Sequence, residues 1–136
     1  MTDGELAEIV RTGHALGVKV AAHAHGTDGI DAALRAGVDT IDHGTFTEAS
    51  SVALFREHDA WLVPTLLPGA TVVRNMYGNP FFTPEIRAKA IDASNAARTA
   101  FELALRGGVN TPSARTPVSR PAVATPKSSR SWSSTA

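Results

Sequence analysis

Three histidines, His23, His25 and His43, are the residues of this sequence whose type and spacing could do chemistry. His23 and His43 each end a short apolar run, and a glycine follows each of them within three residues. Neutral imidazole is the commonest metal ligand in proteins, and about three such ligands with one open position make a catalytic zinc site. The sequence has no cysteine, so any metal must be held by His, Asp or Glu. The pair therefore predicts a divalent metal site, with zinc as the preferred ion, where a bound ion would activate water and polarise a carbonyl group.

The runs that carry these histidines have strand character and alternate with helical segments. We expect helices at 2–16, from 27 or 28 to 36, from a cap at Thr47 onward and at 84–106, strands at 18–24, 38–41 and 61–65, and a long loop at 66–82. Helices between short apolar strands imply parallel strands joined by right-handed crossovers. This α/β order fits an open doubly wound sheet or a (β/α)8 barrel. In a parallel sheet the carboxyl ends of the strands form the face on which sites are built, so His23 and His43 would point into one volume.

A structural role competes with metal binding at each histidine. A single histidine near a strand end is more often a hydrogen-bonded structural residue, but two at consecutive strand ends favour a shared site. His25 follows His23 by two positions, so on a strand it would share the face of His23 and could reach the same cavity. His14 and His58 lie near the ends of expected helices, and we expect both to be solvated beside the negative helix C-terminus.

The charge of the chain is balanced as a whole but divides it into two regions. Residues 1–110 hold 9 Lys+Arg and 13 Asp+Glu, whereas residues 111–136 hold four basic residues and no acidic one. The second region has few large apolar residues, so it cannot bury enough surface to offset the entropy lost on ordering. We predict a globular domain over 1–110 and a disordered tail over 111–136. We see no signal-peptide pattern and no apolar run of about 20 residues, so we expect a cytoplasmic protein without a membrane partner.

The two histidine motifs and the residues between them resemble the amidohydrolase superfamily. The matching stretches are Val20-Ala-Ala-His-Ala-His-Gly and Ala36-Gly-Val-Asp-Thr-Ile-Asp-His-Gly, and Trp61-Leu-Val-Pro-Thr fits the strand that follows. The resemblance points to the imidazolonepropionase-like and prolidase-like branch and covers about residues 3–110. It implies a partial TIM-type (β/α)8 barrel, in which this chain supplies about strands five to seven with their helices.

The resemblance also implies a role for each histidine and an activity for the whole enzyme. By the match, His23 is the metal ligand that closes the fifth strand, His43 is the ligand that closes the sixth, and His25 lies near the substrate. The family activity is metal-dependent hydrolysis of a C–N bond in a small amide, cyclic amide or dipeptide-type substrate. The sequence departs from the pattern because it has no upstream His-x-His pair, no strands one to four and no Gly-Thr-Asp after Val109. The proton-shuttling aspartate is therefore absent, the catalytic residue is unknown, and we expect this chain alone to be an inactive fragment.

Two other functions compete with this interpretation. A non-enzymatic module could use the basic tail to bind nucleic acid or another acidic partner, through Arg115, Arg120, Lys127, Arg130 and Trp132. Four charges over sixteen residues are a thin signal for a nucleic-acid reader. A nucleotide-binding α/β domain would need a Gly-x-Gly-x-x-Gly or a P-loop after a strand, and the sequence has neither. We therefore expect a small-molecule substrate and no nucleic-acid partner.

We predict that the tail is a frameshifted reading of the family's eighth strand. Up to Asn110 the chain follows the family, and the next 26 residues hold seven serines and no acid. Read from the third base of each codon, residues 111–136 permit the string AIGTDAGVSPGGRNAEEFEELVVDG, which supplies the missing Gly-Thr-Asp and then an amphipathic helix. In the DNA sequence, the codons for Ser113, Ala114 and Arg115 should spell Gly-Thr-Asp in that shifted frame. Codons that spell anything else there would end the frameshift explanation.

Overall fold

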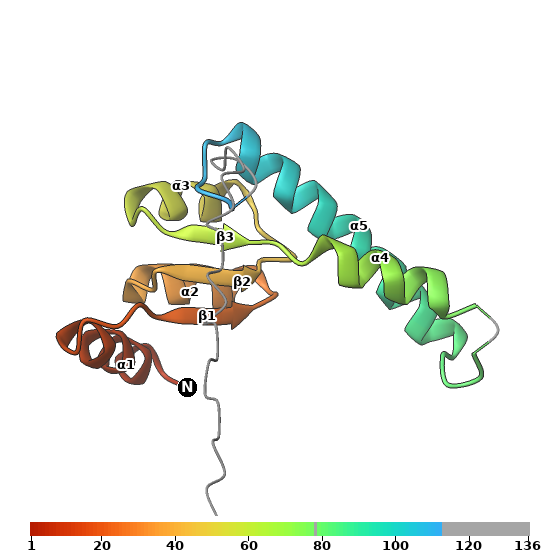
Figure 1. Ribbon diagram of the computed structural model, residues 1–136, viewed down its shortest axis with the longest axis horizontal. Coiled ribbons are helices and arrows are strands. Elements are labelled where there is room, and N and C mark those ends of the chain that lie inside the picture. Colours follow the sequence, from red (N-terminus) through yellow and green to blue (C-terminus); the bar gives the residue numbers. More distant parts are fainter. Residues whose placement is uncertain (78, 113–136) are drawn as a thin grey trace, which may run out of the picture.

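The computed structural model describes residues 1–77 and 79–112, and Figure 1 shows how their elements are arranged. Three strands form one parallel sheet in the order β1-β2-β3, where β1 spans Ala21–Ala24, β2 spans Thr40–His43 and β3 spans Trp61–Val63. The helices are α1 Asp3–Ala15, α2 Thr27–Ala36, α3 Ala49–Glu57, α4 Leu66–Asn75 and α5 Pro84–Arg106. The predicted parallel α/β order is confirmed. The tail that we predicted to be disordered and frameshifted spans residues 111–136, and its residues 113–136 lie outside the described residues.

The strand register places alternate residues on the two faces of the sheet. Ala22, Ile41 and Leu62 lie in one row, and this row packs into the apolar core against α2 and α3. The fully buried residues of this core are Ile30, Leu34, Val38, Ile41, Phe55 and Leu62. The next row carries His23, whose side chain is exposed on the opposite face. Side chains alternate in this way along any pleated strand, so burial of one row leaves the face of His23 open.

Two helix starts follow the predicted capping signals. The Thr2 hydroxyl accepts a hydrogen bond from the Glu5 N–H, and the Glu5 carboxylate accepts one from the Thr2 N–H, which completes a capping box. At α5 the Thr83 hydroxyl caps the helix by accepting a hydrogen bond from the N–H of Ile86. Among the described helices, none has both the length and the apolar character needed to cross a membrane.

Strand β2 begins at Thr40, two residues later than predicted, because Val38 takes part in the motif that ends α2. Gly37 has a φ of 90°, and its N–H donates to the carbonyl of Leu34. The N–H of Val38 donates to the carbonyl of Ala33. This is the bonding pattern of a Schellman motif. Val38 is therefore bonded to the helix rather than to the sheet, and the strand starts at Thr40.

The predicted loop at 66–82 is wrong over its first half, where Leu66–Asn75 form helix α4. The loop was predicted because the segment is rich in glycine and proline, which oppose a helix. Pro68 lies in the first turn, where backbone N–H groups have no intrahelical partner, so a proline costs little there. Helix α4 packs along α5, and together they form a hairpin that extends away from the sheet (Figure 1). This packing is a tertiary contact that no local sequence pattern announces.

The outer edge of β3 pairs with the segment that follows α5. The N–H of Leu62 donates to the carbonyl of Asn110, and Trp61 is bridged to Asn110 in parallel. Thr111, the next residue, is fully buried. The chain therefore returns from α5 to the position that the next strand of a parallel β/α series would take. The domain boundary that we placed after residue 110 stays a prediction.

Asp39 ties α1 to the amino ends of β1 and β2, opposite to the end that carries His43. Its carboxylate accepts hydrogen bonds from Nζ of Lys19 at 2.6 Å and from the N–H of Val20 at 2.8 Å, and it lies 2.8 Å from Nε2 of His14. Partial burial alone would raise the pKa of Asp39, but these three neighbours outweigh it and hold the pKa well below its ordinary range. His14 is exposed, as predicted, and it is also paired with this carboxylate.

A buried hydrogen bond between α2 and α3 gives a test of this packing. The fully buried Ser51 hydroxyl donates to the Asp31 carboxylate at 2.5 Å. We predict that Ser51→Ala lowers the free energy of unfolding by about 1–3 kcal/mol, because the buried carboxylate loses this donor. Ser50→Ala, at an exposed position of the same helix, should change it by no more than about 0.5 kcal/mol. Urea unfolding followed by circular dichroism compares the two, and equal effects would contradict the role of Ser51.

Candidate metal centre

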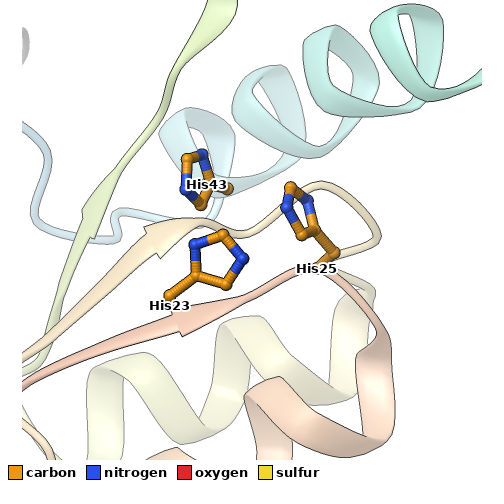
Figure 2. Close-up of side chains that lie close together, drawn as sticks. All are labelled: His23, His25 and His43. Carbon is orange, nitrogen blue, oxygen red and sulfur yellow. The ribbon is translucent and has the colours of Figure 1, made fainter. Parts of the chain in front are cut away.

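The three histidines singled out from the sequence lie together at the carboxyl ends of β1 and β2 (Figure 2). Each offers one ring nitrogen, and these nitrogens lie within 4.8 Å of one another. The ring centres of His23 and His43 are 4.4 Å apart, and that of His25 lies 4.8 Å from His23 and 4.7 Å from His43. His14 and His58 lie elsewhere, near the ends of α1 and α3. The structure therefore brings together every histidine of the predicted site.

An unusual backbone conformation turns His43 toward the other two rings. Regular alternation would place residue 43 on the face of Ile41, against the helices. Instead, His43 has a φ of 75°, and the N–H of Gly44 donates to the carbonyl of Asp42 at 3.1 Å. A positive φ combined with a hydrogen bond across two residues is a γ-turn of the rare and strained type. This turn breaks the alternation, so the imidazole of His43 meets that of His23.

Gly44 and Thr47 hold this turn in place. Gly44 has a φ of 55°, and a Cβ atom at this position would lie 2.4 Å from Cδ1 of Leu62 and 3.0 Å from Oγ1 of Thr47. Only glycine fits both the conformation and the space. The Thr47 hydroxyl donates to the carbonyl of Gly44 at 2.8 Å. We predicted that Thr47 caps α3, and this is wrong: Glu48 takes the N-cap position, and Thr47 braces the histidine turn instead.

Two threonine hydroxyls orient the imidazoles of His25 and His43. Oγ1 of Thr45, just after β2, lies 2.7 Å from Nδ1 of His25. Oγ1 of Thr65, just after β3, lies 2.6 Å from Nδ1 of His43. Each of these histidines is thus held by a hydroxyl of the next strand end along the sheet. When Nδ1–H donates to the hydroxyl oxygen, Nε2 keeps its lone pair for a metal ion.

The donor set fits a divalent ion that accepts imidazole, such as zinc. Two nitrogens that each bind zinc at about 2.0–2.1 Å lie no more than about 4.2 Å apart. The nitrogens of this cluster lie within 4.8 Å, and His23 and His25 are exposed, so small side-chain rotations reach that spacing. Partial burial lowers the pKa of His25, and the neighbouring His43 and His23 lower it further. A lower pKa favours the neutral imidazole, which is the form that binds metals.

A cavity of about 350 Å³ opens beside the histidines, toward α4 and α5. Its described lining residues are His25, His43, Thr45, Thr65, Leu66, Val72, Ala90, Ala93, Ser94 and Ala97. This volume falls within the range of small-molecule pockets. The cavity lies between the strand ends and the helical hairpin, so a small molecule in it would contact the imidazoles of His25 and His43.

A sequence profile of the Amidohydrolase family matches residues 1–114 of this chain. The chain belongs to the amidohydrolase family. The resemblance to the amidohydrolase superfamily that the two histidine motifs gave is therefore confirmed.

This amidohydrolase chain is similar in sequence and structure to solved prolidases. It superposes on a Xaa-Pro dipeptidase with methionine bound in the active site (33% identity, TM-score 0.73) and on a prolidase complexed with N-methylphosphonate-L-proline (31%, TM-score 0.70). Each match covers 82% of this chain and 27% of the other. An ochratoxinase from A. niger shares the fold, at 24% identity and a TM-score of 0.76, over 82% of this chain and 25% of its own.

The match to a curated relative also covers only a small part of that relative's length. An uncharacterized protein of Mycobacterium tuberculosis is 39% identical over 66 residues, which is 48% of this amidohydrolase chain and 18% of the relative. The chain therefore spans about a fifth of that protein and about a quarter of the solved structures.

Sequence reasoning missed the residues that surround the histidines. Thr45 and Thr65 carried a usable signal, because each comes just after a strand end, as the histidines do. The sequence gives no signal for the helical wall of the cavity. This wall depends on α4, where we predicted a loop, and on how α4 packs along α5.

The γ-turn at His43 predicts an inverted order of stability between two variants. At an ordinary strand position, a protein with glycine is less stable than the same protein with alanine by about 0.5–1 kcal/mol. At residue 43, any side chain with a Cβ pays about 1–2 kcal/mol for the positive φ, so His43→Gly should be more stable than His43→Ala by about 1 kcal/mol. Thr40→Gly and Thr40→Ala, on the same strand, should show the ordinary order. Urea unfolding measures all four, and the strain account fails if His43→Gly is the less stable of its pair.

Proposed function

We propose that this chain is the metal-binding part of an amidohydrolase that cleaves C–N bonds in small amide, cyclic amide or dipeptide-type substrates. The observation that carries the proposal is the convergence of His23, His25 and His43 at the carboxyl ends of parallel strands in a chain of this family. In (β/α)8 barrels the active site lies at that end of the strands. We propose that β1, β2 and β3 are strands five, six and seven of such a barrel.

His23 and His43 are the proposed metal ligands, and His25 is the proposed substrate contact. His43 has the fixed orientation that a ligand needs, because its turn is braced and its Nδ1 lies against Thr65. Among the described lining residues of the cavity are His25 and His43 but not His23, so His25 lies on the side of the substrate space. When bound, a zinc ion would lower the pKa of a water molecule and polarise the substrate carbonyl.

A dipeptide-type amide is the substrate that the solved relatives favour. One relative is a Xaa-Pro dipeptidase with methionine in its active site, and another is a prolidase that holds N-methylphosphonate-L-proline. Both are more than 30% identical to this chain over 82% of its length. They support an amino-acid amide as the substrate of the complete enzyme.

We propose that the chain alone is inactive. It spans about a quarter of the length of the solved relatives, so groups from other strands have to complete the site. The Gly-Thr-Asp that the family pattern places after Val109 is not in the sequence, so the aspartate that would accept the proton of the attacking water is missing. The competing proposal of a nucleic-acid-binding tail rests on residues 115–132, outside the described residues.

We predict that the full chain binds one zinc ion weakly, through His23 and His43. Two protein ligands are fewer than the three or four of a stable zinc site, so the affinity should be low. In isothermal titration calorimetry, His23→Ala and His43→Ala should each lower the association constant at least about tenfold, and His25→Ala by no more than about threefold. His58→Ala is the matched control, since His58 is exposed at the end of α3.

Three results would contradict this assignment. If the double variant His23→Ala with His43→Ala folds and still binds zinc at the same stoichiometry, His23 and His43 are not the metal ligands. A loss for His25→Ala as large as that for His43→Ala would make His25 a third ligand rather than a substrate contact. Hydrolysis of a dipeptide by the full chain that a chelator abolishes would show that the chain is active on its own.

A further inference from the structure

The cavity beside the histidines has polar and apolar walls on different elements. The strand ends supply the imidazoles and the hydroxyls of Thr45 and Thr65. The helical hairpin supplies a mostly apolar wall: Leu66 and Val72 from α4, and Ala90, Ala93, Ala97 and the polar Ser94 from α5. None of the ten described lining residues is an Asp, Glu, Lys or Arg. The described lining on the helical hairpin is therefore mostly apolar, with Ser94 as its polar residue, and carries no full charge.

Small side chains on one face of α5 give this cavity its depth. Ala90, Ala93 and Ala97 recur at the spacing that places residues on one side of a helix. Their side chains are half-buried, and Ala88 lies on the exposed side of the same helix. A larger side chain at Ala93 or Ala97 would project into the space between α5 and the histidines.

The chemistry of this wall selects what can enter. A charged group would lose its hydration there without gaining a counter-charge, and this loss is costly. An apolar group would leave water and gain contacts with the alanine face and with Leu66 and Val72. A volume of about 350 Å³ accepts a branched or aromatic side chain.

We propose that this cavity binds the uncharged, apolar side chain of the substrate's amino-acid residue, and that Ala93 and Ala97 set its size limit. The inference rests on the proposed function, because it assumes that the scissile amide lies at the histidines. His25 and His43 line the cavity together with Ala90, Ala93 and Ala97 of α5, so a substrate carbonyl at the histidines leaves the neighbouring side chain in the space beside α5. The preferred substrates are then amides of apolar amino acids.

The test measures binding of three neutral-backbone probes to the full chain, with and without zinc, by NMR titration. The probes are N-acetyl-L-leucinamide, N-acetylglycinamide and the amide of N-acetyl-L-aspartate. We expect the leucine probe to bind at least about tenfold more tightly than the other two, from burial of its side chain. Ala93→Leu and Ala97→Leu should each reduce this preference to threefold or less. Ala88→Leu, the matched change on the exposed side of α5, should keep it.

The methyl signals of Ala93 and Ala97 in the unmodified chain give a second readout that needs no variant. They should shift with the leucine probe and not with the glycine probe. Equal binding of the three probes, or an unchanged preference in both filled variants, overturns the proposal. If zinc binds through the histidines but the probes show no preference, the cavity proposal fails and the proposed function stands. If the preference persists in a chain that binds no zinc, the cavity does bind apolar side chains, but the proposed function fails, and with it the assignment of the cavity to a substrate.

Discussion

The rest of the structure depends on one constraint: the parallel strands end at the same edge of the sheet. The register pairs Ala24 with His43, so residues some twenty positions apart in the sequence reach the same edge of the sheet. Burial of Ile41 and Leu62 against α2 and α3 holds that register. Three strands of three or four residues would be marginal without such packing. The same alignment brings the hydroxyl of Thr65 from the next strand end to the imidazole of His43.

The site also needs one departure from regular strand geometry. The pleat alone would direct His43 toward the helices, and the γ-turn directs it toward His23 instead. Such a conformation costs about 1–3 kcal/mol and persists only where the surroundings determine it. Here the surroundings are the Leu62 side chain, which leaves no room for a Cβ atom at Gly44, and the hydrogen bond from Thr47. The fold therefore supplies the free energy that holds the imidazole in position before any ligand arrives, which lowers the cost of assembling a metal site.

Much of this arrangement could be predicted from the sequence, because the decisive signals were local. Short apolar runs between helical segments gave the parallel order, and the positions of His23 and His43 at the ends of those runs gave the shared site. The γ-turn could not be predicted, since a positive φ at a histidine depends on what packs around the following glycine. Helix α4 was missed because its segment is rich in glycine and proline, although Pro68 falls in the first turn, where a proline costs little, and the helix packs along α5. The cavity depends on that packing and was missed with it.

The claim that His23 and His43 face one volume is tested most directly by NMR of the histidine ring nitrogens during a zinc titration. The structure predicts that the ring signals of His23 and His43 change together, with Nε2 of His43 as the coordinating nitrogen because its Nδ1 lies against Thr65. The signals of His14 and His58, which lie outside the cluster, should stay unchanged. Changes of His23 and His43 at different zinc concentrations, or equal changes at His14 and His58, would contradict the account.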